Sequence, residues 1–534
     1  MGDQRILALV VILGLTVVAL TALAHRIRVA PAVPLLLGGV LLALVPGWGG
    51  VAMDPGVVLL LFLPGLLYWE SLNTSLREIR ANLRVVILTS VLLVLVTAAV
   101  VAVAAHAIGM PWPTAWVLGA VLSPTDATAV SAIARSMPRR MLTTLRAESL
   151  INDGTALVLL AIALEVAGGS GEFRLGSAAG LFFLAYGAGI AAGGVTALAA
   201  TFVRRKVEDP VLSASLSILT PFAAFLLAEV VHGSGVLAVV VSGLVLSQVG
   251  PRFISAGARV TGLSFWRLSA FLLNGTLFVL VGLQVPRAVR GLDSTSLTRA
   301  GFAVLVVGTA VIGTRLAWSY TTPYVIRALD RRPSQRLRRV SARHRLPSAW
   351  AGFRGAVSLA AALSIPTTLK DGAELPGRDL VVLVTAGVIL LTILIQGLSL
   401  PAVLRWARLP ADRREAQEER LAQRAAAEAG LAALPMVATD LDLPAHVVAR
   451  VRDEYVEHLA ELSEDAPEDD GPEDGSPTHD ASALRSLRAA LLPHKRAAVV
   501  QLRDDGTIDD IVLRRVQARL DVEDLRLAPP SGAE

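Results

Sequence analysis

Apolar residues form long uninterrupted stretches in the first three quarters of the chain. Runs of about twenty such residues recur, which is the length of helix that crosses the hydrocarbon layer of a bilayer. We therefore predict an all-α polytopic membrane protein with about thirteen transmembrane helices. The expected spans are 5–24, 30–46, 55–75, 85–108, 113–134, 142–167, 176–203, 210–230, 233–249, 264–285, 299–326, 348–367 and 378–404.

The pattern changes near residue 408, so we divide the chain into a transmembrane domain, 1–408, and a helical tail, 409–534. Residues 411–462 are rich in Ala, Glu and Arg at helical spacing. The acidic segment 464–480 contains Pro and Gly, a composition typical of disorder. Further helices are expected over 481–526, with a break at Gly506. The tail is interpreted either as an aid to assembly or as a regulatory domain.

Composition and charge agree with a membrane location. Hydrophobic residues make up 54% of the chain and charged residues 17%, whereas about a quarter of a soluble protein is charged. The net charge is +5, but the basic residues lie mainly in alternate short loops. This distribution predicts an external N-terminus and a cytoplasmic C-terminus, and it explains the basic balance better than nucleic-acid binding does. The loop 286–299 fits this rule least well.

Two of the predicted spans carry ionisable groups near their middle. The first contains Ser-Pro-Thr-Asp-Ala-Thr-Ala-Val at 123–130. Pro124 removes a backbone donor and interrupts the helix, and Thr125 and Asp126 then place oxygen atoms at the interruption. A carboxylate at membrane depth costs about 2.5–3.5 kcal/mol, so it indicates a functional site. A proline kink with Asp126 hydrogen-bonded to a neighbour is the structural alternative.

The second polar segment is Glu-Ser-Leu-Ile-Asn-Asp-Gly-Thr-Ala at 148–156. Ser149 and Asp153 are four residues apart and share one helix face. Their oxygens suit a small monovalent cation, and nothing nearby offers the nitrogen or sulfur ligands of a transition metal. A buried carboxylate can hold either a proton or a cation near neutral pH, which is the minimum requirement for exchange. The neutral Asn152 is expected to orient Asp126 or Asp153.

Other polar residues within apolar spans have predicted partners or roles. Arg354 requires a buried carboxylate, and Glu148 is the candidate. Arg315 also lies mid-span, but the sequence does not identify its partner. Glu70 either ends its span at the interface or faces the ion site, and Asn274 is interpreted as a helix–helix hydrogen-bonding residue.

These segments resemble those of NhaP-type sodium/proton antiporters, in the monovalent cation/proton antiporter family that includes the animal sodium/proton exchangers. The resemblance rests first on the motifs at 123–130 and 148–156. Supporting motifs occur in the same order at 66–73 (Leu-Leu-Tyr-Trp-Glu-Ser-Leu-Asn), 271–284 (Phe-Leu-Leu-Asn-Gly-Thr-Leu-Phe-Val-Leu-Val-Gly-Leu-Gln) and 352–360 (Gly-Phe-Arg-Gly-Ala-Val-Ser-Leu-Ala). The tail segment 502–525 is also similar to bacterial members, though less specifically.

The resemblance implies a homodimer of thirteen-helix subunits with inverted repeats, crossed broken helices and a separate dimerisation part. It implies that Asp153, preceded by Asn152, carries both cation and proton, and that this pair is typical of electroneutral members. Thr125, Ser149 and Glu70 would also contact the cation, and Asp126 would stabilise the crossing helix ends. Glu148 and Arg354 would form a structural ion pair.

The expected function is exchange of Na⁺ (or Li⁺) for H⁺ across the cell membrane, in pH homeostasis, with no cofactor. A K⁺/H⁺ antiporter of the same architecture and a cation channel or sensor are the alternatives. The chain lacks an HExxH motif, a P-loop and a convincing nucleophile–histidine set, so an enzyme or ATP-driven pump is not expected. The sequence identifies no ligand for the tail.

Overall fold

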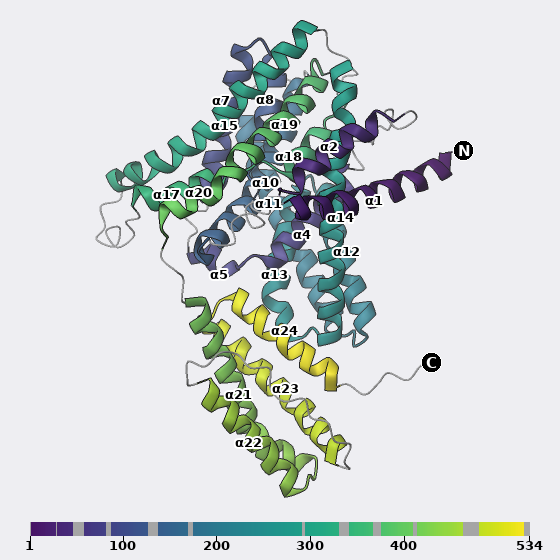
Figure 1. The fold of residues 1–534 in the computed structure, drawn as a ribbon, viewed down its shortest axis with the longest axis vertical. Helices are drawn as coiled ribbons and strands as arrows, with labels where there is room; N and C mark the ends of the chain where they lie inside the picture. The colour runs from purple at the N-terminus through teal and green to yellow at the C-terminus, as the bar shows by residue number, and fades with distance from the viewer. Residues whose placement is uncertain are drawn as a thin grey trace.

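The computed structural model describes residues 2–27, 29–45, 58–81, 87–126, 137–168, 175–290, 294–329, 341–366, 375–409, 414–462 and 480–527. Within these ranges the regular structure is helical, which confirms the predicted all-α class. Figure 1 shows a large helical bundle with the helices of the C-terminal tail below it. Residues 127–130 of the first polar motif and nearly all of the acidic segment 464–480 lie outside the described residues.

Nine of the helices in the described ranges are long and apolar enough to cross a membrane. They are α1 (Gly2–Ile27), α7 (Leu93–Ala107), α10 (Arg139–Ala167), α11 (Leu175–Arg204), α12 (Pro210–Val230), α13 (Gly235–Val249), α14 (Ala256–Arg290), α15 (Ser294–Leu329) and α19 (Arg378–Thr392). Three of them reach this length together with adjoining helical turns: α7 with the preceding η2 (Leu88–Leu92), α13 with the following η3 (Gly250–Arg252), and α19 with η4 (Ile393–Gly397) and α20 (Leu398–Ala407). The other four predicted spans contain shorter or interrupted helices. These are α2 (Ala32–Ala43), α4 (Leu63–Asn73), α8 (Trp112–Leu122) and the pair α17 (Ala342–Trp350) and α18 (Ala356–Leu363).

Several helices begin where the sequence supplies a cap. The Asp209 carboxylate accepts a hydrogen bond from the Leu212 backbone nitrogen at 2.7 Å, directly before α12. Pro210 occupies the first helical position, where its missing N–H costs nothing. Ser234 caps α13 in the same way. These contacts satisfy backbone donors that the first turn of a helix leaves unpaired.

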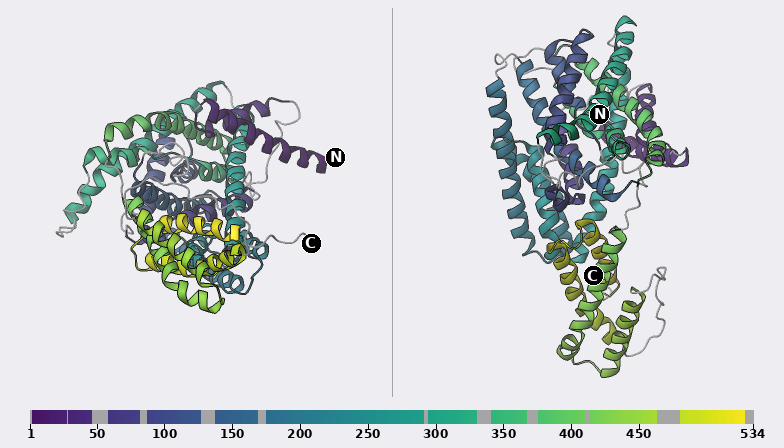
Figure 2. Two further views of the ribbon diagram at one scale, coloured as in Figure 1. Left: turned by 60° about the horizontal axis from the view of Figure 1, so that its bottom comes forward. Right: turned by 90° about the vertical axis from the view of Figure 1, so that its left-hand side faces the viewer.

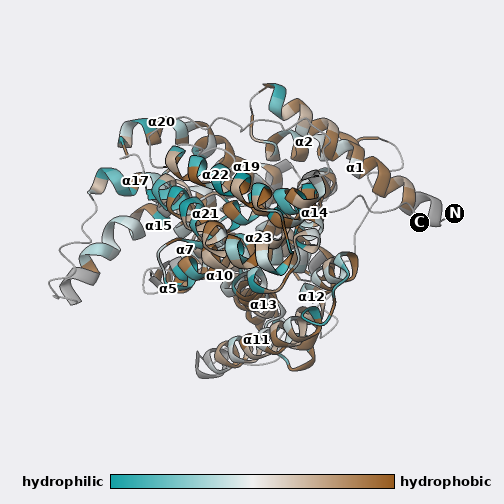
Figure 3. Ribbon diagram, turned by 90° about the horizontal axis from the view of Figure 1, so that it is seen from below, coloured by the Kyte–Doolittle hydropathy of each residue, from teal (hydrophilic) through white to brown (hydrophobic). Residues whose placement is uncertain are grey.

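The bundle contains two large apolar clusters. One joins α1, α2, α4 and α11 to α14, and the other joins α7, α8 and α15. The helices α10, α18 and α19 contribute to both. Outward-facing apolar side chains remain uncovered, with Leu198 69% and Phe202 62% exposed on α11. Figure 3 shows this hydrophobic rim along α1, α2 and α11. Such a surface is stable against lipid and identifies a membrane protein.

The tail consists of α21 (Arg414–Asp440), α22 (Ala445–Glu461), α23 (Asp480–Asp504) and α24 (Asp510–Leu527). Two apolar clusters hold these helices together. Gly506 lies in the turn between α23 and α24 with a φ of +76°, a backbone conformation that favours glycine. Figure 2 shows the tail packed against one end of the bundle.

Candidate functional site

Two interrupted helices meet inside the bundle. Helix α8 ends at Leu122, and residues 123–126 are not helical, which is consistent with a break at Pro124. Residues 351–355 likewise separate α17 from α18. The backbone nitrogen of Asp126 donates to the backbone oxygen of Phe353 at 2.8 Å, so the two unwound segments are joined where they cross. Such interruptions expose peptide groups that can bind ions within a membrane.

Helix α10 carries the second polar motif against this crossing. The Ser149 hydroxyl donates to the backbone oxygen of Thr125 at 2.8 Å, and the Asn152 amide donates to the Thr125 hydroxyl at 2.8 Å. Asn152 therefore contacts Thr125 through its amide nitrogen, rather than Asp126 or Asp153 as we expected. Asp153, which follows it on α10, is 3% exposed.

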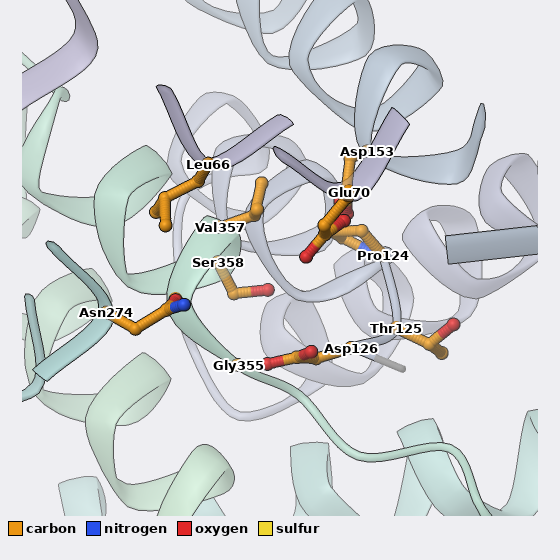
Figure 4. Close-up of a pocket in the computed structure, with 11 residues that line it drawn as sticks. Leu66, Glu70, Pro124, Thr125, Asp126, Asp153, Asn274, Gly355, Val357 and Ser358 are labelled. Carbon is orange, nitrogen blue, oxygen red and sulfur yellow. The ribbon is translucent and has the colours of Figure 1, made fainter. Parts of the chain in front are cut away.

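A pocket beside the crossing brings three carboxylates together. Asp153 from α10, Glu70 from α4 and Asp126 from the unwound segment all line it, as Figure 4 shows. None of the eleven described lining residues is basic. Carboxylates that share one buried pocket cannot all be ionised without a counter-charge, so the pocket is suited to protons or a cation. The remaining lining residues are Leu66, Pro124, Thr125, Asn274, Gly355, Ala356, Val357 and Ser358.

A second buried pocket, which shares Thr125 with the first, is lined by Arg315 and Arg354. Arg315 from α15 donates to Glu148 at 2.5 Å, and both side chains are nearly inaccessible to solvent. Our predicted pair of Glu148 with Arg354 is therefore wrong in this structure. Arg354 lies in the same pocket, but its guanidinium donates to the backbone oxygen of Gly352 at 3.4 Å. Arg315 reaches Glu148 because α15 packs closely there, and a Cβ at Gly352 would overlap its side chain.

Sequence comparison now identifies the family. The family profile described as "Sodium/hydrogen exchanger, transmembrane" matches residues 12–406. The chain belongs to the sodium/hydrogen exchanger family. This result confirms the resemblance inferred from the motifs. The exchanger is a cation/proton antiporter and not an enzyme.

Individual relatives agree with the family assignment. An uncharacterised Na⁺/H⁺ exchanger of Mycobacterium tuberculosis is 47% identical, over 100% of this chain and 98% of the relative. A Na⁺/H⁺ antiporter of the NhaP type from Aphanothece halophytica is 30% identical, over 72% of each chain. The sodium/proton antiporter NhaP1 of Methanocaldococcus jannaschii has a similar structure. Its TM-score is 0.58 at 16% identity, covering 77% of this chain and 100% of that one, and this likeness supports the fold alone.

The pocket of the exchanger differs in part from the site predicted from sequence. Asp153, Asp126, Glu70 and Thr125 all line it, whereas Ser149 is absent from its lining. Sequence reasoning did not select Ser358, and it assigned Asn274 to helix packing. Both are neutral and polar, so they carry no charge to mark them. Their positions within the quoted motifs, at 352–360 and 271–284, are the signal that could have identified them.

Replacing Gly355 with alanine is expected to disrupt the helix crossing. An added Cβ would overlap the carboxylate of Asp126, so one of the unwound segments must shift. Overpacking of this kind lowers the free energy of unfolding by about 1–3 kcal/mol. Unfolding of the purified protein in detergent would measure the change. Gly313→Ala on α15 is the matched control, since its added Cβ meets nothing within 4 Å. Equal stabilities for the two variants would contradict the close approach at Gly355.

Proposed function

We propose that the exchanger swaps Na⁺ or Li⁺ for H⁺, one for one, by competition of the two ions for Asp153. The observation that carries this proposal is the burial of Asp153 in a pocket shared with Glu70 and Asp126. Oxygen atoms are the only strong ligands among the lining side chains, and they suit a small alkali cation. A cation entering the pocket replaces the proton as counter-charge, so binding of one ion releases the other.

The proposed one-for-one exchange depends on the neutrality of Asn152. The residue before Asp153 cannot ionise, so it adds no further titrating group to the three carboxylates of the pocket, and its amide is engaged with Thr125. Loading the site with Na⁺ then changes its charge by the same amount as loading it with H⁺. The overall cycle is electroneutral on this account.

We assign the remaining predicted residues to three roles. Glu70 and Thr125 contact the cation from the pocket wall. Ser149, which is absent from the lining, positions Thr125 through the hydrogen bond from its hydroxyl to the Thr125 backbone oxygen. Asp126 stabilises the crossing, where its backbone is already bound to Phe353.

The larger assembly is also part of the proposal. Alternating access would move the α7, α8 and α15 part of the bundle against the α4 and α11 to α14 part, which have separate apolar clusters. We place the tail in the cytoplasm, because it contacts Arg77, Arg252 and Arg259, which lie between the predicted spans in segments that the charge rule assigns to that side. We further propose a homodimer that contributes to pH homeostasis.

A cation series in proteoliposomes tests the function. Outward gradients of Na⁺, Li⁺ and K⁺ would be imposed in turn, with a pH-sensitive dye inside the vesicles and the membrane potential clamped at several values. We expect Na⁺ and Li⁺ to drive proton flux more strongly than K⁺, at rates independent of the potential. Protein-free liposomes provide the background.

Each alternative has a distinct result in this assay. A preference for K⁺ would favour the K⁺/H⁺ antiporter. Cation flux without proton counter-flux would favour a channel or sensor. Proton flux that varies steeply with the potential would show unequal charge exchange and would contradict electroneutrality.

A further inference from the structure

The tail makes specific polar contacts with helix α4, the element that carries Glu70. The guanidinium of Arg514, on α24, donates to the backbone oxygens of Leu72 at 3.2 Å and Asn73 at 2.9 Å. These are the last two residues of α4. Carbonyls in the final turn of a helix lack intrahelical partners, and a cation there also interacts favourably with the helix dipole. Arg514 therefore caps α4 from 442 positions further along the chain.

The turn after α4 is held by the tail as well. The Ser75 hydroxyl lies 2.7 Å from Asp509 Oδ1 and 2.9 Å from Asp510 Oδ2, and it can donate to either. All three residues are at most 4% exposed. Arg77, on the short helix α5 (Leu76–Ala81), donates to the backbone oxygen of Ile508 at 2.6 Å. The last residues of α4 and the residues that follow it are thus both bound to the tail.

The same tail helix is bound to α14, which carries Asn274. Arg259 donates to both carboxylate oxygens of Asp521, at 2.7 and 2.8 Å. Arg252, in the turn η3 (Gly250–Arg252), donates to Asp504 at 2.6 Å. Burial would raise the pKa of Asp504, but this hydrogen bond and the nearby Arg503 lower it below its ordinary value. The tail therefore connects two helices that each supply a side chain to the cation pocket.

The final turn of α4 is close to the pocket. Helix α4 continues directly from the π-helical turn η1 (Val58–Phe62), and Glu70 lies three positions before Asn73, its last residue. The Thr74 hydroxyl donates to the backbone oxygen of Glu70 at 2.7 Å, so Glu70 belongs to the turn that Arg514 caps. The last turn of a helix is lost readily when its terminal carbonyls are left unpaired.

We propose that Arg514 caps α4 and thereby holds Glu70 opposite Asp153. Arg514 is thus a positioning residue of the cation pocket. This inference rests on the proposed function, because it assigns Glu70 to the cation. It makes the tail part of the transport machinery rather than a separate attachment.

Arg514→Gln is the first test, with Na⁺-driven proton flux measured in proteoliposomes. We expect KM for Na⁺ to rise about three- to tenfold, the range for residues coupled indirectly to a binding site, with little change in kcat. Arg514→Lys keeps the charge at the helix end and should recover part of the loss. Arg488→Gln is the matched control. It breaks an ion pair with Glu454 between two tail helices and should leave KM unchanged.

A double-mutant cycle with Glu70→Gln separates positioning from general damage. Its readout is the rise in Tm that Na⁺ causes, because this reports binding even in a variant that does not transport. Arg514→Gln should reduce the rise in the wild-type background and leave it unchanged in the Glu70→Gln background. The Tm without Na⁺ reports folding separately.

Any of three outcomes would overturn the inference. The first is an unchanged KM in Arg514→Gln, and the second is an equal loss of Na⁺ response in both backgrounds. An unaltered response in Glu70→Gln alone would also overturn it, since Glu70 would then not contact the cation. Failure of the proposed exchange mechanism is distinguishable from failure of this inference. The mechanism is tested with variants of Asp153, whereas this cycle changes only Arg514 and Glu70.

Discussion

Replacing Asp153 with asparagine is expected to reduce Na⁺-driven proton flux to the level of protein-free liposomes. The amide is close to the carboxylate in size, so the buried pocket keeps its shape. It cannot release a proton near neutral pH and cannot neutralise a bound cation. Both halves of the exchange are therefore lost together. The measurement is dye-reported proton flux after a Na⁺ gradient is imposed.

Asp379→Asn provides the matched control for this variant. Asp379 is in the first turn of α19 with its side chain 60% exposed, and the same chemical change there should leave flux at the wild-type rate. Competition for one carboxylate adds a second expectation. Protons occupy the site more fully as the pH falls, so the apparent KM for Na⁺ in the wild-type protein should rise. Retained exchange in both Asp153→Asn and Asp153→Ala would exclude Asp153 as the carrier.

Removing either partner of the Glu148–Arg315 pair is expected to be the most destabilising single change. The two side chains are 6% and 5% exposed, and an unpaired charge left in such a site costs about 3–5 kcal/mol. Glu148→Gln and Arg315→Met should each lower the free energy of unfolding by that amount. Unfolding of the purified protein in mixed micelles measures the change.

The control for this prediction is an ion pair of similar geometry at the surface. Arg424 and Glu428 are 2.8 Å apart on α21 and more than half exposed, so Arg424→Met should cost about 0.3–0.5 kcal/mol. Double-mutant cycles then compare Arg315 and Arg354 as partners of Glu148. A larger coupling energy with Arg354 would contradict the pairing in the structure and restore the one predicted from the motifs.

Features that depend on local sequence were predictable. The length and hydropathy of each apolar run locate the helices, since a bilayer imposes a minimum length. The interruption after Leu122 was expected from Pro124, which lacks a backbone donor, together with the polar residues that follow it. The position of Asp153 inside the bundle was predictable because it lies within a long apolar run, and a carboxylate there is costly and rarely incidental.

Features that depend on packing between distant segments were not predictable in the same way. Glu148 had two buried arginines as potential partners, and the choice depends on how α15 lies against residues 351–355. The partner of Asn152 depends likewise on the path of the chain after Pro124, which brings Thr125 within 2.8 Å. Neutral pocket residues such as Ser358 give no electrostatic signal in the sequence. Ser358 lines the pocket because of the direction in which α18 begins.

The hydrogen bonds around Thr125 and Asp126 have a consequence for the path of the ion. They tie the crossing segments and α10 into one mechanical unit, which carries Asp153. Glu70 and Asn274 belong to α4 and α14, which are bound to the tail. An ion bound to Asp153 that moved with this unit would keep the ligands that belong to the unit. It would exchange only the ligands on other helices, such as Glu70 and Asn274. Selectivity between alkali cations would then depend chiefly on Glu70 and Asn274, the ligands that do not move with the ion.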